Sequence, residues 1–346
     1  MPTPPRPTAA IASVGHYLPP DRLTNADLEA LVDTDDEWIR TRTGIRERRI
    51  LRDPSKATSF MCTEAARVCL DKAGVAPDDV ECILVATITP DVAFPATACL
   101  VQDQLGAGRA WGYDVSAACS GFLFALTSAA KMIEAGMHRR VLVIGADTMS
   151  RIIDYTDRTT CVIFGDGAGA VLLERADDGT GVLDSVQYAD GSGVAALYQP
   201  AGGSLRPASL ATVEAREHFV RQDGKTVFKR AVVGMAEAAA EIMDRNGLSA
   251  DDVRYLVPHQ ANLRIIEATA KRMGVGPEQV MVNIERYGNT TAGTLPLCLA
   301  DWEPELRRGD NLVLAAFGGG FTWGATWVKW AYDGEGGRRK AEGGSA

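Results

Sequence analysis

The chain has 346 residues, which is enough for two domains of ordinary size or one large one. Hydrophobic residues make up 46% of it and charged residues 23%, a composition that excludes a disordered, collagen-like or disulfide-dense protein. Its 36 basic and 45 acidic residues give a net charge of −9, which argues against a protein whose whole surface binds nucleic acid.

The seven cysteines indicate neither a zinc site nor a disulfide framework. Their number is odd, no two of them form a CxxC pair, and the chain has only four histidines. Most lie in apolar stretches, as small buried residues do in a reducing compartment. The sequence MPTPPRPTAA at the N-terminus lacks the apolar segment of a signal peptide, and no stretch approaches 18 uninterrupted apolar residues. We therefore expect a cytoplasmic protein with no membrane segment and no metal.

The chain repeats itself at an offset of 173 residues. Residues 64–84 and 237–257 are identical at 8 of 21 ungapped positions. In each copy, apolar residues three and four apart predict a helix, a glycine ends it, and a short β-rich run follows. A continuous apolar run suited to a buried strand comes later in each half, at 140–146 and 311–316. Alternating helices and buried strands predict an α/β fold of two βα-type halves, packed as a pseudo-dimer.

The expected boundaries follow from this repeat and from the composition of the ends. The first half is expected to span residues 11–183 and the second residues 184–331. Residues 1–10 are rich in proline and residues 332–346 in glycine and charge, so both are predicted to be disordered tails.

Cys119 lies where the period of the sequence changes. Residues 111–115 suit a strand, and from Phe122 onward the apolar residues follow helical spacing. The cysteine is therefore predicted at the N-terminus of a helix, with Ser116 as its cap, where partial positive charge and free N–H groups stabilise a thiolate. A buried structural cysteine is the alternative that the residues alone leave open.

The segment 165–170 fits the pattern GxGxxA but does not predict a dinucleotide site. It introduces the β-rich run AVLLE, whereas such a site needs a strand, a turn and then a helix. The chain also contains no P-loop, HExxH or GxSxG motif.

Further polar residues follow predicted strands in the second half. His259 comes just after a short strand that Pro258 closes, and Asn262 is placed to cap the next helix. Asn289 lies in a loop between a strand-like and an apolar segment. A satisfied core histidine and a simple Gly-Asn turn are the alternatives. The glycines 318–320 indicate either a tight hairpin or a close approach of backbone N–H groups to a substrate.

Seven blocks of the sequence together resemble the β-ketoacyl-acyl-carrier-protein synthase III family, the initiating condensing enzymes of type II fatty acid synthesis. They are spread over residues 10–330 and read DTDDEWIRTRTGIRERR (33–49), AFPATACLVQ (93–102), DVSAACSGF (114–122), DRTTCVIFGDGAGAV (157–171), VPHQANLRII (257–266), YGNTTAG (287–293) and AFGGGFTWG (316–324). The resemblance implies the thiolase-like fold, with a five-layered α-β-α-β-α core, and a homodimer. It further implies that acyl-CoA acylates the cysteine and that malonyl-acyl carrier protein is the second substrate. The products are a 3-oxoacyl carrier protein, CoA and CO₂, with no cofactor and no nucleic acid involved.

The resemblance also assigns roles to single residues. Cys119, His259 and Asn289 match the catalytic triad, and the N–H of Cys119 together with Gly319 matches the oxyanion hole. The other matches are Trp38, Arg42, Arg158 and Asn262 for CoA; Phe94 (from the partner subunit's chain), Phe164 and Phe317 for the acyl pocket; and Lys229, Gln260, Ala261, Asn262, Leu263, Arg264 and Lys271 for the carrier protein. Of the last group, Arg264 and Lys271 are seven residues apart and share one face of the predicted helix, for which a solvated charged face is the alternative.

Other functions stay open at this level. The nearest is another thiolase-fold condensing enzyme, such as a polyketide or secondary-metabolite synthase. A Cys/His/Asn hydrolase and an inactive acyl-binding module are alternatives from other classes. The segment Thr291-Ala-Gly293 differs from the commoner Ser-Ala-Ala of the family, which leaves the starter acyl group open.

Overall fold

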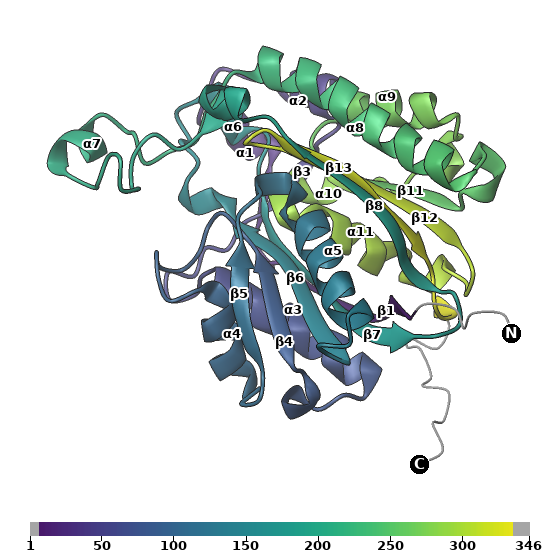
Figure 1. Ribbon diagram of the computed structural model, residues 1–346. Helices are drawn as coiled ribbons and strands as arrows, with labels where there is room; N and C mark the ends of the chain where they lie inside the picture. Colours follow the sequence, from purple (N-terminus) through teal and green to yellow (C-terminus); the bar gives the residue numbers. More distant parts are fainter. Residues whose placement is uncertain (1–6, 335–346) are drawn as a thin grey trace, which may run out of the picture.

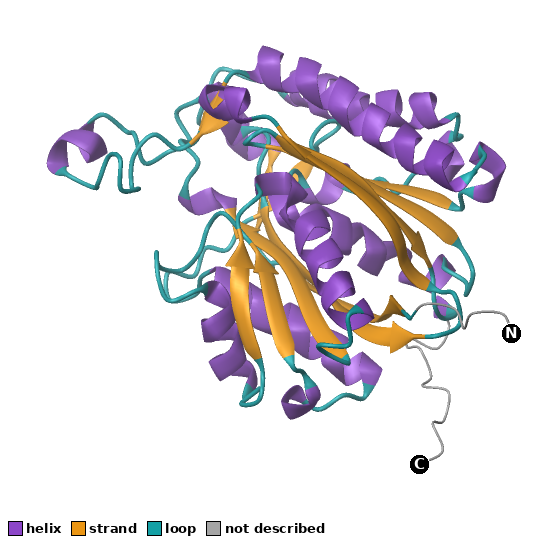
Figure 2. Cartoon of the chain, viewed as in Figure 1, coloured by secondary structure: helices purple, strands orange, loops and turns teal. Residues whose placement is uncertain are grey.

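Two β-sheets, one from each half of the chain, form the centre of the fold (Figures 1 and 2). The structure is a computed structural model, and it describes residues 7–334. The first sheet has the strand order β1-β7-β6-β4-β5 and the second the order β11-β12-β13-β8. In these orders the strands are β1 (Thr8–Tyr17), β7 (Asp166–Ala176), β6 (Arg140–Thr148), β4 (Cys82–Ala86) and β5 (Trp111–Val115), then β11 (Tyr255–Pro258), β12 (Asn311–Gly318), β13 (Thr322–Lys329) and β8 (Gly181–Ala189).

The two sheets have the same pattern of strand directions, which confirms the internal repeat. In the first sheet β4 runs parallel to β6, and both β6 and β1 run antiparallel to β7. In the second sheet β11 runs parallel to β12, and both β12 and β8 run antiparallel to β13. β4 begins at Cys82 and β11 at Tyr255, which is the 173-residue offset of the sequence repeat.

Helices cover both faces of each sheet and give the expected five layers (Figure 1). The buried residues form one apolar cluster between the outer helices and the first sheet, one between the two sheets, and one between the second sheet and its outer helices. The outer helices are α3 (Thr58–Ala73) and α4 (Thr97–Leu105) on the first sheet and α8 (Gly224–Asn246) and α9 (Leu263–Met273) on the second; the central helices are α5 (Gly121–Glu134) and α11 (Thr294–Trp302). The α-β-α-β-α arrangement of the thiolase-like fold is therefore confirmed.

The local sequence explains where the equivalent helices end and how the central layer packs. α3 ends at Gly74 and α8 at Gly247, with φ of +65° and +63°, a left-handed conformation that glycine adopts without strain. α5 lies between the two sheets and is buried on almost every side, and the small side chains of Ala125 and Ala129 let both sheets approach it.

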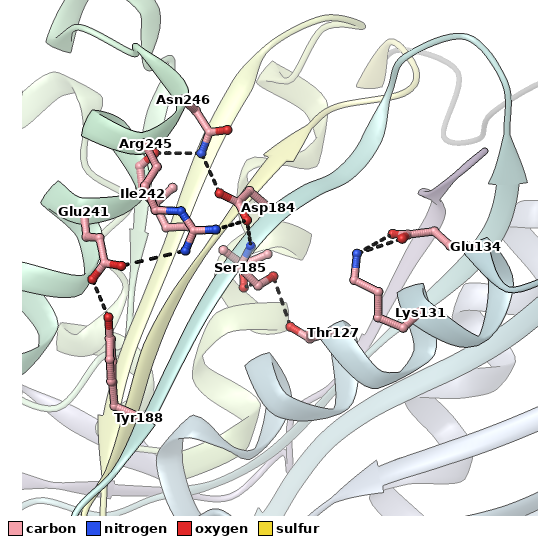
Figure 3. Close-up of polar contacts among 11 residues, drawn as sticks. Thr127, Lys131, Glu134, Asp184, Ser185, Tyr188, Glu241, Ile242, Arg245 and Asn246 are labelled. Atoms are coloured by element: carbon pink, nitrogen blue, oxygen red, sulfur yellow. Dashed lines mark hydrogen bonds and ion pairs between the residues drawn. The ribbon is translucent and has the colours of Figure 1, made fainter. Parts of the chain in front are cut away.

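A polar cluster ties the outer helix α8 to β8 and the central helix α5 (Figure 3). Asp184 of β8 accepts hydrogen bonds from the guanidinium of Arg245 (3.1 Å) and from Nδ2 of Asn246 (2.9 Å). Ser185 Oγ accepts one from the hydroxyl of Thr127 on α5 (3.2 Å). Asn246, which continues the apolar spacing of the repeat, therefore binds Asp184 instead of packing in the core.

The smaller elements lie outside the two sheets. Figure 1 shows α7 at the tip of an arm that projects away from the layers. The smaller helices are α1 (Asn25–Glu29), α2 (Asp36–Thr43), α6 (Arg158–Cys161), α7 (Leu210–Glu214) and α10 (Ile284–Tyr287). The smaller strands form two pairs: β2 (Arg22–Thr24) pairs with β3 (Glu47–Arg49), and β9 (Leu197–Tyr198) pairs with β10 (Arg221–Gln222).

The expected boundaries need three corrections. β1 already begins at Thr8, because residues 8–10 pair with the end of β7, so the N-terminal tail is shorter than ten residues. The boundary between residues 183 and 184 falls inside β8, all of which belongs to the second sheet. Tyr332, expected to open the C-terminal tail, is buried and donates a hydrogen bond to Glu303 (2.6 Å). The rest of the predicted tails, residues 1–6 and 335–346, lies outside the described residues.

No helix within residues 7–334 combines the length and the apolar character needed to cross a bilayer.

Candidate active site

Cys119 lies between β5 and α5, in a short turn at the entrance of the central helix. The turn spans Ala118–Ser120, and Ala118 adopts a positive φ of +46°. The predicted position at a helix N-terminus is correct, but the predicted cap is wrong. α5 starts at Gly121, so Ser116 is too far from its first turn, and it lines a cavity instead.

A cavity of about 330 Å³ opens at Cys119. Apolar side chains from several loops form much of its wall, namely those of Ile88, Met149, Ile152, Phe164, Leu197 and Val220. Cys119 and Gly319 both line it, so a group attached to the sulfur has apolar space beside it. The wall residues come from segments far apart in the sequence, and no pattern in the sequence points to them as a set.

Burial controls the ionisation of Cys119. It raises the pKa of the thiol to about 12, the negative charge of Asp147 acts in the same direction, and a hydrogen bond from Asn289 opposes both. The expectation of a stabilised thiolate is therefore wrong for the resting protein. A helix N-terminus contributes about 0.3–2 kcal/mol, which is less than the cost of holding an ion in an apolar interior. The dipole of α5 acts only on charge that develops as the proton leaves.

His259 lies at the end of β11, as the sequence predicts, and is 2% exposed. Desolvation lowers its pKa to about 3, so the imidazole is neutral at physiological pH. Its Nδ1 lies 2.8 Å from the hydroxyl of Thr294, which also lies 3.0 Å from the carbonyl oxygen of Thr291. A hydroxyl carries one proton, so it donates either to Nδ1 or to the carbonyl. In the first case Nε2 is the protonated ring nitrogen.

Asn289 is held at both its backbone and its side chain. Its N–H donates to the carbonyl of Ile163 (3.0 Å), and its own carbonyl accepts from the N–H of Gly165 (3.0 Å). Side-chain Oδ1 accepts a hydrogen bond from the N–H of Thr291 (2.8 Å). Because Oδ1 is occupied in this way, Nδ2 is the end of the carboxamide that is left to donate toward Cys119.

The glycine cluster at the end of β12 approaches Cys119 closely. A Cβ atom at Gly318 would lie 2.6 Å from the backbone nitrogen of Cys119, which no side chain tolerates. β12 and β13 also form a hairpin across this cluster, so the hairpin interpretation of the glycines is confirmed. Gly319 follows Gly318 in the chain and lines the cavity together with Cys119.

Trp38 lies between two arginines. The guanidinium of Arg42 is 4.8 Å and that of Arg158 is 4.3 Å from the centre of the indole ring. Asn262 caps α9 by accepting from the N–H of Arg264 (3.0 Å), and its Nδ2 donates to the carbonyl of Arg42 (2.7 Å). The structure thus brings together all four residues that the resemblance assigns to CoA, with Asn262 joining α2 to α9.

The three phenylalanines assigned to the acyl pocket lie in different surroundings. Phe164 lines the cavity at Cys119, whereas Phe94 is 85% exposed on a loop and lies outside the cavity of its own chain. The assignment of Phe317 is wrong. Side chains alternate along β12, so Gly318 faces Cys119 while Phe317 faces α8 and packs against Trp323 with ring centres 6.0 Å apart.

The residues assigned to the carrier protein also lie in different surroundings, some buried and some exposed. The assignment of Gln260 is wrong, because this side chain is fully buried. Its amide donates to the carbonyls of Pro258 and Met281, and its Oε1 accepts from the N–H groups of Asn283 and Ile284. Residues 261–263 are half-buried and lead into α9, which begins at Leu263.

A basic surface covers the adjoining parts of α8 and α9. Lys229 of α8 and Arg264 and Lys271 of α9 are exposed. The guanidinium of Arg264 lies 5.1 Å from the ring centre of Phe228, a contact that holds it against α8. Within the described part of the chain, no group of three or more His, Cys, Asp or Glu side chains is placed to hold a metal ion.

The chain matches two family models. One is described as 3-oxoacyl-[acyl-carrier-protein (ACP)] synthase III and covers residues 113–191, and the other is the C-terminal part of the same family and covers residues 243–330. The β-ketoacyl-[acyl-carrier-protein] synthase III of Chlorobium chlorochromatii is 60% identical over 326 residues, which are 93% of this chain and 99% of the relative.

Solved structures agree with these matches. The 3-oxoacyl-[acyl-carrier-protein] synthase III of Aquifex aeolicus has a TM-score of 0.86 and 42% identity, over 93% of this chain and 100% of its own. The priming β-ketosynthase of the R1128 polyketide pathway has a TM-score of 0.87 and 34% identity, over 96% of this chain and 99% of its own. From the fold, the site and these matches it follows that the chain belongs to the β-ketoacyl-acyl-carrier-protein synthase III family of condensing acyltransferases.

Proposed function

We propose that this protein condenses an acyl-CoA starter with malonyl-acyl carrier protein through an acyl-cysteine at Cys119. The products are a 3-oxoacyl carrier protein, CoA and CO₂, and the reaction initiates fatty acid synthesis. The observation that carries the proposal is the turn at residues 291–294. It contributes Thr291 to the Cys119 cavity and is hydrogen-bonded to both Asn289 and His259.

In the first half-reaction, the sulfur of Cys119 attacks the thioester carbonyl of acyl-CoA. The bond from sulfur to the acyl carbon forms, the bond to the CoA sulfur breaks, and the thiol proton leaves with CoA. Because the resting thiol is protonated, negative charge develops on sulfur only as the proton leaves, and the N-terminus of α5 favours that charge. The N–H groups of Cys119 and Gly319 donate hydrogen bonds to the carbonyl oxygen and stabilise the negative charge that develops on it.

In the second half-reaction, the malonyl group loses CO₂ and its electron pair forms a thioester enolate. Nδ2 of Asn289 and Nε2–H of His259 donate to the enolate oxygen, and Nε2 carries the proton when Thr294 donates to Nδ1. The enolate carbon then attacks the acyl-cysteine, and Cys119 leaves as a thiolate that takes up a proton. Both donors are uncharged, which suits an apolar site better than a cation without a partner would.

The two substrates approach from the side of α2 and α9. Trp38, Arg42 and Arg158 offer an aromatic face and two cations to the nucleotide of CoA. The basic surface of Lys229, Arg264 and Lys271 suits an acidic carrier protein, because its charge is opposite and two of its residues lie on α9, the helix that follows His259. No metal or cofactor is required by these steps.

A homodimer is the second part of the proposal. β5 is the outermost strand of the first sheet, and Trp111 on it is 46% exposed. Such an edge is a template for pairing with a second copy. The exposed ring of Phe94 is then available to the cavity of the partner subunit. A cytoplasmic location stays a prediction.

The test is a product assay with purified protein, acyl-CoA and malonyl-acyl carrier protein. We expect one CoA and one CO₂ for each 3-oxoacyl carrier protein formed. Free fatty acid in place of this product would identify a hydrolase, and an unchanged mixture would identify an inactive acyl-binding module.

A further inference from the structure

Asp147 is a buried carboxylate at the end of β6 that no step above uses. It is 0% exposed, and burial raises its pKa. One oxygen, Oδ1, accepts three hydrogen bonds from the loop after β4. These come from the hydroxyls of Thr87 (3.0 Å) and Thr89 (2.9 Å) and from the N–H of Ile88 (2.8 Å).

The other oxygen reaches across to the second half of the chain. Oδ2 accepts a short hydrogen bond from the hydroxyl of Thr291 and a longer one from the N–H of Ala292 (3.3 Å). The carboxylate therefore joins a loop of the first half to the turn that follows Asn289.

Thr291 needs this support. It is a β-branched residue with a φ of +50°, in the left-handed region that such side chains rarely adopt. A conformation of this kind costs on the order of 1–3 kcal/mol and persists only where surrounding contacts fix it. The bond from its hydroxyl to Asp147 is one of those contacts.

The backbone of Thr291 contacts one proposed enolate donor, Asn289, directly and lies near the other, His259. Its N–H holds Oδ1 of Asn289 at 2.8 Å, which sets the direction of Nδ2. Its carbonyl lies 3.0 Å from the hydroxyl of Thr294, and that hydroxyl lies 2.8 Å from Nδ1 of His259. One residue, Thr291, thus stands between Asp147 and Asn289, whereas His259 is one further residue away, behind Thr294.

We infer that Asp147, acting through Thr291, is the positioning residue that sets Asn289 for the condensation step. This inference rests on the proposed function. Asp147 does not serve the nucleophile, since its charge raises the pKa of the Cys119 thiol and so opposes ionisation. A displacement of about 1 Å at a reacting centre costs about 100-fold in rate, so a clamp remote from the substrate has a measurable effect.

The experiment compares Thr291→Val with Thr291→Ser in the full-length protein. Valine keeps the branched shape and loses the hydroxyl, whereas serine keeps the hydroxyl. With enzyme acylated beforehand, Thr291→Val is expected to lower kcat for condensation by about 10-fold, with KM for malonyl-acyl carrier protein within about 2-fold of wild type. Thr291→Ser is expected to stay within about 3-fold of wild type. Thr87→Val is the matched control, because it removes a donor from Oδ1 and leaves the Oδ2 link in place.

A double-mutant cycle separates positioning from general destabilisation. Adding Thr291→Val or Asp147→Asn to Asn289→Ala is expected to cause little further loss of condensation, because the clamp acts through the missing side chain. Full additivity would overturn the inference, and so would a wild-type kcat in Thr291→Val or an equal loss in the Thr87→Val control. If Asn289→Ala itself condenses at the wild-type rate, the proposed function of the site fails along with the clamp.

Discussion

The turn that carries Cys119 and the turn that follows Asn289 are equivalent parts of the two halves. Each is a short 3₁₀ turn, Ala118–Ser120 or Thr291–Gly293, that leads directly into a central helix. The first residue of each has a positive φ, +46° at Ala118 and +50° at Thr291. These two residues are separated by the 173-residue offset of the repeat.

The same backbone conformation serves different chemistry in the two turns. The first presents the nucleophile itself to the cavity. The second presents no reacting group, but its backbone and the hydroxyl that follows it hold Asn289 and His259. In the proposed function, one half of the duplicated fold therefore supplies the acyl-carrying sulfur and the other half the enolate donors.

Removing the two side chains that the second turn holds is expected to have the largest effect. His259→Ala and Asn289→Ala should each lower condensation by about 10²–10³-fold, because each removes a donor to the enolate oxygen. Asn289→Ala should affect acyl transfer from CoA much less, since that step depends on Cys119 and its own N–H groups. The two half-reactions are measured separately by single turnover. Equal losses in both after Asn289→Ala would contradict the division between the turns.

The buried imidazole of His259 is expected to make stability depend on pH. Its pKa is lowered to about 3, whereas an unfolded histidine titrates near 6.5, so below pH 6.5 the unfolded state binds more protons. Stability then falls as the pH falls, by about 1.4 kcal/mol per unit from this residue, or about 2 kcal/mol between pH 6.5 and 5. Denaturant unfolding of wild type and His259→Gln at both pH values checks this. An equal loss in the variant would show that other groups are responsible.

The basic surface beside the second turn is expected to have a moderate effect. Arg264→Glu should raise KM for malonyl-acyl carrier protein by about 3- to 10-fold, and the effect should shrink as salt is added. Acyl transfer from CoA should change little. Lys131→Glu on α5 is the control, with the same change of charge at an exposed site away from α9. The docking surface would lie elsewhere if both variants behaved alike.

The smallest expected effect comes from Phe94, which the proposal makes available to the acyl cavity of the partner subunit. Phe94→Ala should shift the preference among acetyl-, isobutyryl- and octanoyl-CoA by a few-fold and leave acetylation of Cys119 intact, because the ring is exposed in its own chain. Relative kcat/KM values for the three thioesters check this. An unchanged profile would remove Phe94 from the acyl pocket.

The internal repeat and the positions of its main helices and strands were predictable from local sequence patterns. Helical spacing, helix-ending glycines and continuous apolar runs act over a few residues, so α3, α8, β6 and β12 lie where the sequence puts them. The position of Cys119 at a helix entrance was predictable for the same reason.

Features that depend on contacts between distant segments were not predictable in this way. Burial of the thiol reverses the expected ionisation of Cys119, and the alternation of β12 turns Phe317 away from the cavity. Gln260 lies among polar residues of its motif, yet its side-chain amide donates to backbone carbonyls in the protein interior. Asp147 and Thr291 are 144 residues apart in the sequence, so no local pattern predicts the hydrogen bond between them.

The acylation of Cys119 is tested most directly by intact-mass measurement with acyl-CoA alone, followed by peptide mapping. We expect wild type and Cys99→Ala, a control at the one exposed cysteine of the described chain, to gain a single acyl group on the peptide that contains Cys119. Cys119→Ala is expected to gain none while keeping its melting temperature close to that of wild type. An acyl group that maps to Cys161 or Cys298, or that persists in Cys119→Ala, would contradict the assignment.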